Sequence, residues 1–217
     1  MAKHKLPWPT KAVMEQIYDQ HLWGGTEFDF YSGDGSHSET FVKPYVEAVL
    51  DFFKSHENNL TVCDLGCGDF NIGKQLFQFT KTYIAIDIVA SLIERNKNQF
   101  IANHLKLYCL DISKDELPNA DCIILRQVLQ HLSNAEVFQI VKKLSKYKYI
   151  ILTEHIPNGE FIPNKDIISG QGIRLKYSSG VDVLKAPFNL KVKEERVLND
   201  IVLDNKKGRI LTFLYTT

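Results

Sequence analysis

The sequence has no excess of charge of either sign, because 26 lysine and arginine residues balance 26 aspartate and glutamate residues among its 217. A neutral balance argues against a surface built mainly to bind nucleic acid. Long apolar runs are also lacking: runs such as CIIL and YIIL are far shorter than the roughly 20 residues of a membrane-spanning helix. The first ten residues, MAKHKLPWPT, hold two prolines and no apolar run, which excludes a secretory signal. We therefore expect a cytoplasmic protein without a membrane partner.

Cysteine, glycine and proline are scarce, which excludes further classes of protein. The chain has 4 cysteines, 12 glycines and 7 prolines, so it is neither collagen-like nor a disulfide-stapled scaffold. The cysteines lie in or beside apolar runs at spacings that match no disulfide or metal signature: Cys63, Cys67, Cys109 and Cys122. We expect buried, reduced thiols and no bound metal. The remaining composition, 44% hydrophobic and 24% charged, is that of one globular domain.

From residue 60 onward, apolar runs of strand length alternate with segments of helical periodicity. The predicted strands are Leu60–Leu65, Tyr83–Asp87, Leu105–Leu110, Asp121–Leu125 and Tyr149–Thr153. The predicted helices between them are Asn71–Phe79, Ser91–Phe100 and Asn134–Tyr147. Ser133 is expected to cap the last helix, with Glu136 completing a capping box. Such nearly continuous apolar strands, joined by helices, are typical of a parallel sheet covered on both faces.

Both ends of the chain depart from this alternation. Two helices, Lys11–His21 and Thr40–Lys54, are predicted before the first strand, separated by the glycine-rich polar stretch Gly24–Ser38. Two extended stretches, Lys191–Val197 and Arg209–Thr216, are joined by LDNKKGR and predict an antiparallel hairpin. The predicted fold is a Rossmann-like, doubly wound α/β sheet of seven mostly parallel strands with a C-terminal hairpin and N-terminal helices. We divide this single domain, 1–217, into a cap and lid (1–58), a core (59–156), an acceptor segment (157–190) and the hairpin (191–217).

The segment VCDLGCGDFNIGKQL, from Val62 to Leu76, combines a strand, an acidic residue and two glycines before a helix. Glycine at positions 66 and 68 lets backbone approach a ligand closely. A lone Gly-x-Gly is also an ordinary strand-to-helix turn, so this segment alone assigns no function.

Aspartates at three successive strand ends strengthen the functional interpretation. Asp64 lies near the end of the first strand, Asp87 closes the second, and Asp111 follows the third. Carboxyl ends of parallel strands meet at one edge of an open sheet, where such folds bind ligands. A carboxylate at position 87 is placed to accept hydrogen bonds from a ribose diol, and one at 111 to reach an adenine ring. We therefore predict a nucleotide-like ligand in this crevice.

These residues resemble the class I S-adenosylmethionine-dependent methyltransferases over about residues 60–156. The resemblance implies that Asp64, Gly66 and Gly68 cradle the amino acid end of the cofactor, that Asp87 holds the ribose and that Asp111 faces the adenine. It also implies that their neighbours Cys67, Ile88 and Ile112 belong to the cofactor site. NAD-dependent oxidoreductases share the glycines and the ribose acid. They give no reason for Asp64 or Asp111, and Phe70 stands where their third glycine would be, so we expect a crowded turn for a pyrophosphate.

A narrower resemblance extends to the ends of the chain. The sequence is similar to a bacterial group of methyltransferase-like proteins, of unassigned substrate, with several short motifs. These motifs appear here as WGG at 23–25, SGDGS at 32–36, CGDFNI at 67–72, LRQVLQHL at 125–132, NKDIISG at 164–170 and PFNL at 187–190. Three positions depart from the group: Asp34 replaces a proline, Ile72 a tryptophan and Gln127 an aspartate. The last change removes a carboxylate beside the expected methyl-transfer site and weakens a general-base role there.

After the fourth strand, Arg126 and Gln127 are expected beside the cofactor, with His131 about one turn later. His131 has two interpretations: a proton acceptor for a hydroxyl or amine, or a side chain hydrogen-bonded to backbone beneath the next loop. The apolar residues around it favour the structural role. Arg126 is expected to pair with a carboxylate of the cofactor or to fix a loop of the protein.

Two segments are candidates for covering the site. The SGDGS box can fold over a ligand as a lid, and three aromatic residues near it, Tyr18, Trp23 and Tyr31, can face a sulfonium or simply pack the helices. We place Trp23 in the cofactor site. The long segment 157–190 is predicted to form the acceptor pocket, or else to cover the sheet edge. Its polar candidates are Asp166, Arg174, Tyr177 and Asp182.

The sequence therefore predicts an S-adenosylmethionine-dependent methyltransferase that releases S-adenosylhomocysteine. The neutral charge favours a small-molecule or saccharide acceptor over nucleic acid. The alternatives are a non-catalytic binding module of the same fold, an NAD-dependent oxidoreductase and an RNA methyltransferase.

Overall fold

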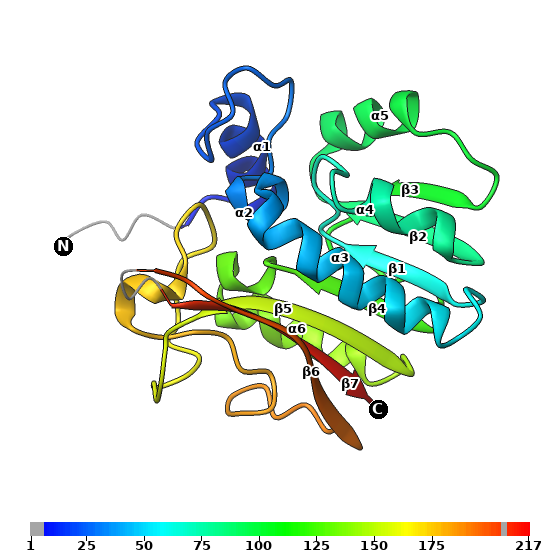
Figure 1. Ribbon diagram of the computed structural model, residues 1–217. Coiled ribbons are helices and arrows are strands. Elements are labelled where there is room, and N and C mark those ends of the chain that lie inside the picture. Colours follow the sequence, from blue (N-terminus) through cyan, green and yellow to red (C-terminus); the bar gives the residue numbers. More distant parts are fainter. Residues whose placement is uncertain (1–6, 205–207) are drawn as a thin grey trace.

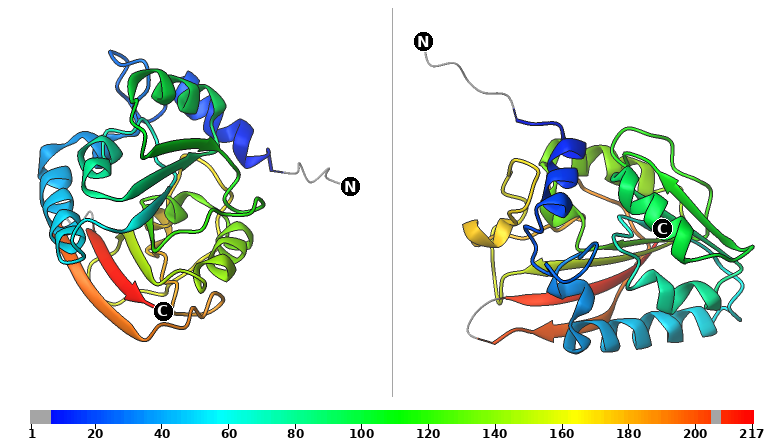
Figure 2. Two further views of the ribbon diagram at one scale, coloured as in Figure 1. Left: turned by 90° about the vertical axis from the view of Figure 1, so that its right-hand side faces the viewer. Right: turned by 90° about the horizontal axis from the view of Figure 1, so that it is seen from above.

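The computed structural model describes residues 7–204 and 208–217, which form one seven-stranded sheet with helices on both faces (Figures 1 and 2). The strand order is β3-β2-β1-β4-β5-β7-β6. Its strands are β1 Thr61–Leu65, β2 Thr82–Asp87, β3 Leu105–Cys109, β4 Cys122–Arg126, β5 Tyr149–Ile156, β6 Glu194–Val202 and β7 Arg209–Thr216. Strands β1 to β5 pair in parallel, and β7 pairs antiparallel with both β5 and β6. The predicted mostly parallel sheet with an antiparallel hairpin is confirmed.

Helices pack on the sheet through the apolar stripes that the sequence predicts. They are α1 Thr10–Asp19, α2 Asp34–His37, α3 Glu39–Lys54, α4 Gly73–Leu76, α5 Ala90–Gln99 and α6 Asn134–Leu144. Short 3₁₀ helices follow at η1 Phe77–Phe79, η2 Leu129–His131 and η3 Arg174–Tyr177. One apolar core lies between the sheet and α3 and α4, and the other lies between the opposite face and α1 and α6. The capping box of Ser133 and Glu136 at the start of α6 is confirmed.

Several boundaries differ from the prediction. The helix expected at 71–79 is split into α4 and η1, and the SGDGS box contains the single helical turn α2. Strand β5 continues to Ile156 because it pairs with β7 along its whole length. Strand β6 begins at Glu194 rather than Lys191, since it follows the register of β7 and has an irregularity between Val197 and Asn199. The middle of the predicted hairpin connection, 205–207, lies outside the described residues.

Three cysteines are buried and free, as expected, whereas Cys109 is exposed because β3 is an edge strand of the sheet. None of the helices in the described ranges has the length and hydrophobicity needed to cross a bilayer.

The order of the strands fixes the position of the site. The chain winds outward from β1 to β2 and β3 on one side, and through β4 and β5 on the other, so the connections diverge between β1 and β4. In an open α/β sheet this reversal leaves a crevice beyond the carboxyl ends of the strands. Figure 1 shows the N-terminal segment (blue) and the residues around η3 (yellow) gathered at this end of the sheet.

Candidate functional site

A cavity of about 500 Å³ lies at the carboxyl ends of the strands, within the size range of small-molecule sites. All twelve residues that the sequence analysis proposed for cofactor binding or catalysis line it: Trp23, Asp64, Gly66, Cys67, Gly68, Asp87, Ile88, Asp111, Ile112, Arg126, Gln127 and His131. Residues far apart in the chain thus share one cavity. Their roles toward a ligand stay predictions.

Residues 66–69, which we call the glycine turn, connect β1 to the residues before α4. Gly66 and Gly68 have φ angles of +83° and +57°, which favour glycine. A Cβ at Gly66 would lie 2.5 Å from Val128 Cγ2, and one at Gly68 would lie 2.3 Å from Ser32 Oγ. Close packing against Val128 and Ser32 therefore leaves no room for a side chain at either glycine, in addition to the positive φ angles.

The turn's amide groups have protein partners. The N–H groups of Gly66 and Cys67 donate to the Ile86 carbonyl at 2.8 and 2.9 Å. The Gly68 N–H donates to Asp87 Oδ2 at 3.0 Å. Phe70 points into the aromatic core and does not line the cavity, so the predicted crowding of a pyrophosphate by this side chain is wrong. A pyrophosphate would instead lack hydrogen-bond donors here, because these N–H groups already donate to the Ile86 carbonyl and the Asp87 carboxylate.

Asp64 and Asp87 are buried carboxylates at neighbouring strand ends. Asp64 accepts a hydrogen bond from the Tyr83 hydroxyl at 2.9 Å, and burial raises the pKa of Asp64 to about 7. Asp87 Oδ1 accepts the Val89 N–H at 3.0 Å, and burial also raises the pKa of Asp87. Each carboxylate costs free energy to keep ionised in this environment. A cationic or hydrogen-bond-donating ligand would reduce that cost.

Asp111 follows β3 and is more accessible than the other two aspartates. Its Oδ1 accepts hydrogen bonds from the Ser113 N–H and hydroxyl, and its Oδ2 accepts one from Lys114. Burial alone would raise the pKa of Asp111, but the bonds from Lys114 and Ser113 outweigh it and lower the pKa. Asp111 therefore presents an ionised carboxylate at the rim of the cavity.

Arg126 and Gln127 at the end of β4 face the N-terminal segment. Arg126 Nη2 donates to the Gly35 carbonyl at 2.6 Å, and its guanidinium lies 4.7 Å from the ring centre of Tyr45. Its Nε has no hydrogen-bond partner among the described residues. Gln127 is in the left-handed backbone region and packs against Gly35, whose Cβ would lie 2.1 Å from Gln127 Oε1. Arg126 thus fixes a loop of the protein, one of its two expected roles.

His131 lies at the end of η2 with its ring 5.1 Å from that of Trp23. Its Nδ1 is 3.1 Å from the Gly170 carbonyl oxygen. A carbonyl only accepts, so Nδ1 carries the proton and Nε2 keeps its lone pair. Burial lowers the pKa of His131 to about 4. The backbone bond matches the structural interpretation. The Nε2 atom lies 3.3 Å from Gln130 Nε2 and accepts its N–H, so the neutral ring is a weak proton acceptor.

Residues 24–38, which we call the lid, form one wall of the cavity through Ser32, Gly33, Gly35 and Ser36. Tyr18 and Trp23 pack edge to face beneath it, with ring centres 5.4 Å apart, and both line the cavity. Tyr31 does not line it; its ring stacks on His37 at 4.2 Å.

The segment 157–190 contributes to the cavity, but through other residues than predicted. None of Asp166, Arg174, Tyr177 and Asp182 lines it. Asp166 accepts the Asn134 N–H at 2.7 Å, Asp182 accepts the Leu184 N–H, and Tyr177 is 57% exposed at the surface. Arg174 is buried with its guanidinium on backbone carbonyls. The residues that do face the cavity are Gln171, Gly172, Ile173 and Lys176.

Sequence reasoning also missed polar residues opposite the glycine turn. Gln130, Thr10 and Glu136 line the cavity. Glu136 accepts hydrogen bonds from the hydroxyls of Thr10, Ser133 and Ser169, which lower its pKa although burial opposes them. The capping box explained Glu136 locally, so nothing in the sequence pointed to its second role.

Solved structures share this fold at low sequence identity. N-methyltransferase NodS from Bradyrhizobium japonicum, in complex with S-adenosylhomocysteine, matches with a TM-score of 0.67 and 11% identity over 94% of this chain and 98% of that one. Magnesium protoporphyrin IX methyltransferase from Synechocystis, with bound S-adenosylmethionine, matches with a TM-score of 0.57 and 14% identity over 98% and 99%. The methyltransferase domain of a bacterial Hen1 protein matches with a TM-score of 0.59 and 16% identity over 81% and 98%.

No curated protein matches the chain significantly in sequence. A family model described as a methyltransferase domain matches residues 56–204, well over half of the chain. This match includes β1 to β5, the glycine turn and most of the cavity wall. The chain therefore belongs to the methyltransferase-domain family.

Proposed function

We propose that this protein is an S-adenosylmethionine-dependent methyltransferase that acts on a small-molecule or saccharide acceptor. The observation that carries the proposal is the convergence of Asp64, Asp87 and Asp111 on one cavity beside the glycine turn. Membership of the methyltransferase-domain family supports it. So do the ligands of two proteins with the same fold, S-adenosylhomocysteine in NodS and S-adenosylmethionine in magnesium protoporphyrin IX methyltransferase.

The residues of the cavity fit this cofactor chemically. Asp87 offers acceptors for the ribose hydroxyls, and Asp64 a carboxylate for the ammonium group of the amino acid end. Apolar side chains beside them suit the faces of an adenine ring, namely Ile88, Leu110 and Ile112. A dinucleotide fits less well, because the turn amides that would bind its pyrophosphate already donate to Ile86 and Asp87.

The cofactor, when bound, would supply a methyl group activated by a positively charged sulfur, for transfer to an oxygen, nitrogen or carbon of the acceptor with S-adenosylhomocysteine as the leaving group. The protein orients the acceptor and excludes water, which makes the encounter effectively unimolecular. The lid and Trp23 are placed to exclude water. His131 is our candidate for the acceptor's proton, and its low pKa suits an acceptor that needs orientation more than early deprotonation.

We further propose that 1–217 works as one domain in the segments set out above and that it is related to the narrower bacterial group. Lys176, Gln171 and Ile173 then face the acceptor, because they line the cavity from the segment 157–190.

Replacing Asp87 with alanine tests the proposed function. We expect Asp87→Ala to weaken S-adenosylmethionine binding by about 1–3 kcal/mol, on the order of 10- to 100-fold in Kd, because the ribose hydroxyls lose a buried acceptor. Isothermal titration calorimetry measures both variants, with Asp51→Ala on the exposed face of α3 as the control. Wild-type protein that binds NADH but not S-adenosylmethionine would contradict the proposal.

Replacing Trp23 with alanine tests the aromatic wall of the cavity. We expect a loss of about 0.5–1.5 kcal/mol in cofactor affinity, since an aromatic face near a sulfonium is stabilising. The matched control is Trp8→Ala, because Trp8 is exposed and does not line the cavity. Unchanged affinity in the Trp23 variant would remove this residue from the cofactor site.

A further inference from the structure

Two of the sequence motifs, SGDGS and CGDFNI, contact each other in the structure. The SGDGS box at 32–36 lies in the lid, and the residues of CGDFNI at 67–72 form the glycine turn and the start of the next segment. The Ser32 N–H donates to Asp69 Oδ2 at 2.9 Å, and the Asp69 N–H donates to Ser32 Oγ, also at 2.9 Å. The Asn71 side chain donates to the Ser36 carbonyl at 2.7 Å. The two motifs are therefore joined by three hydrogen bonds.

The Asp69 carboxylate is the centre of this contact. Its Oδ2 lies 2.5 Å from His37 Nε2, in addition to the Ser32 N–H that it accepts. Its Oδ1 accepts the Asn71 N–H at 3.1 Å. The residue is 5% exposed. One oxygen thus holds two positions of the lid while the other holds the chain beyond the glycine turn.

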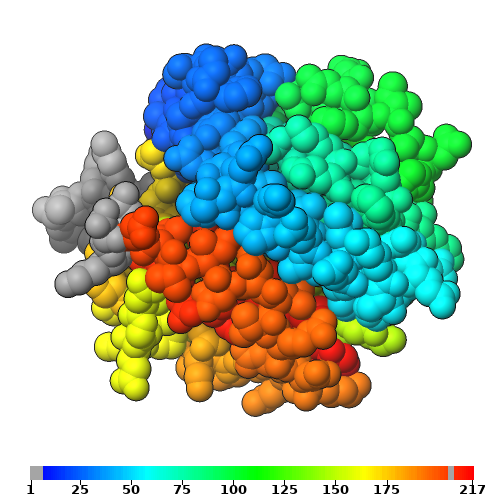
Figure 3. Space-filling view, in the orientation of Figure 1, coloured from blue at the N-terminus to red at the C-terminus, as the bar shows by residue number. Residues whose placement is uncertain are grey.

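The lid is held largely by polar contacts of this kind. Not one of residues 24–38 is buried, although the half-buried Phe30 packs against the apolar core beside Tyr18. Beyond Asp69, it is held by Arg126 at Gly35 and by Arg95, which pairs with Asp29 and donates to the Asp69 carbonyl. Figure 3 shows the lid region (blue) lying against α5 (green), the helix that carries Arg95. A segment with few buried contacts opens at low free-energy cost when such bonds are lost.

The lid and the glycine turn also line the same cavity. Ser32 and Gly33 face it from the lid, and Cys67 and Gly68 face it from the turn. Gly68 is bonded to Asp87 through its N–H, and the next residue, Asp69, is bonded to the lid. A ligand that contacts both walls stabilises the closed arrangement, and the closed arrangement in turn retains the ligand.

We infer that Asp69 is a positioning residue that holds the lid closed over the cofactor and so sets how long the cofactor stays bound. This inference rests on the proposed function. Asp69 acts through Ser32 and His37, since neither its own side chain nor that of His37 lines the cavity. Release of the used cofactor then requires the Asp69 contacts to break.

The test is the kinetics of cofactor exchange in Asp69→Asn. The protein has two tryptophans, and a Trp8→Phe background leaves Trp23 in the cavity wall as the fluorescent reporter. Stopped-flow mixing with S-adenosylhomocysteine gives association and dissociation rate constants. We expect the dissociation rate constant to rise about 10- to 100-fold, because the amide has one uncharged acceptor oxygen where the carboxylate has two charged ones. Amide hydrogen exchange in residues 24–38 of the free protein should be about tenfold faster.

A control variant and a second lid variant distinguish failure of the role of Asp69 from failure of the proposed function. Asp34→Asn changes a lid side chain that accepts a hydrogen bond from the Tyr31 hydroxyl within the lid, and it should leave the dissociation rate unchanged. If Asp69→Asn does not fold, His37→Gln replaces it, with a smaller rise expected because Ser32 still binds Asp69. If these variants bind the cofactor with wild-type affinity and an unchanged dissociation rate constant, the role of Asp69 is overturned and the proposed function stands. A wild-type protein that binds neither cofactor form overturns both.

Discussion

Arg174→Met is expected to lower the free energy of unfolding by roughly 3–5 kcal/mol, because several buried acceptors lose a charged hydrogen-bond donor at once. Arg174 is 1% exposed. Its guanidinium donates to the carbonyls of Leu129, Leu132 and Lys165 at 2.7–3.0 Å, and to Asn134 Oδ1 at 2.7 Å. Methionine fills similar volume but satisfies none of these acceptors. Urea denaturation followed by circular dichroism measures the loss.

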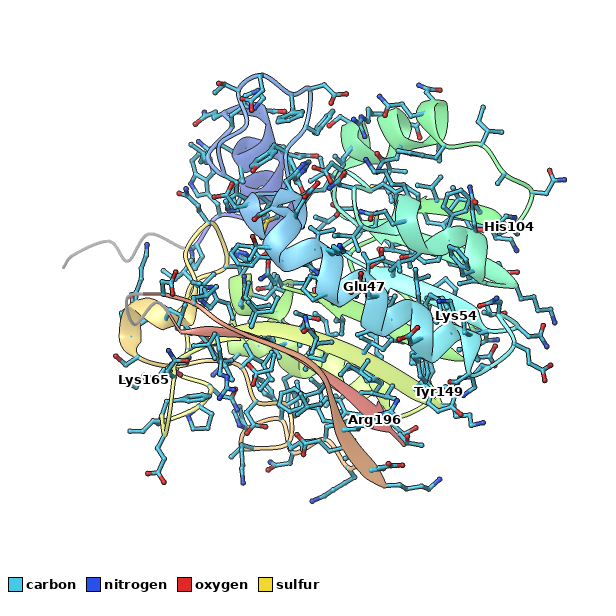
Figure 4. The ribbon with its side chains drawn as sticks, viewed as in Figure 1. Glu47, Lys54, His104, Tyr149, Lys165 and Arg196 are labelled. Atoms are coloured by element: carbon cyan, nitrogen blue, oxygen red, sulfur yellow. The ribbon has the colours of Figure 1, made fainter. Side chains whose placement is uncertain are left out.

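The matched control for this prediction is Arg196→Met. Arg196, labelled in Figure 4, lies on β6 and is exposed, so the same substitution there should change stability by no more than about 0.5 kcal/mol. If Arg174→Met were as stable as this control, the hydrogen bonds of the Arg174 guanidinium would not contribute to stability as expected. The same variant should also loosen His131, since Arg174 holds the carbonyls of the residues on either side of it.

Arg174 also shows why a correct fold prediction does not yield every role. In the sequence it was one polar residue in a long irregular segment, and it was interpreted as part of the acceptor pocket. Apart from Lys165, its partners lie about 40 positions earlier in the chain, on or just after η2 and at the start of α6. No local pattern encodes such distant backbone carbonyls. Buried polar groups find their hydrogen-bond partners through tertiary contacts, and the periodicity of apolar residues carries no information on those.

The sheet and the acidic strand ends were predictable because they rest on local signals. Strands such as β4 are buried along their whole length, so they stand out as apolar runs. Once the strands are parallel, residues after their carboxyl ends must converge, which placed Asp64 and Asp87 in one cavity. The start of β6 was not predictable in this way, because its residues are mostly exposed and its limits follow the pairing with β7.

Glu154→Gln is expected to remove one large contribution to the pH dependence of stability between pH 5 and pH 9, beside those of the buried Asp64 and Asp87. Glu154 is 3% exposed on β5, and neither carboxyl oxygen has a hydrogen-bond partner in the described part of the chain. Burial raises the pKa of Glu154 to about 8, although the charge of Arg174 opposes this. A carboxyl whose pKa is higher in the folded state stabilises that state below its ordinary pKa and loses this contribution as pH rises through 8. The wild type should therefore become less stable across this range.

The size of the effect follows from the free energy of ionising a buried acid. Between pH 5 and pH 9 the stability of Glu154→Gln relative to wild type should rise by roughly 3–5 kcal/mol, since each pKa unit corresponds to about 1.4 kcal/mol. Taking the difference between variants cancels the other titrating groups, including Asp182, Lys185 and Glu195, which line the neighbouring cavity with Glu154. Glu160→Gln, at an exposed position in the following loop, is the control and should parallel the wild type. If the free energy of unfolding of Glu154→Gln also changed with pH as that of the wild type does, this carboxyl would be ionised and solvated in the folded protein, contrary to its burial.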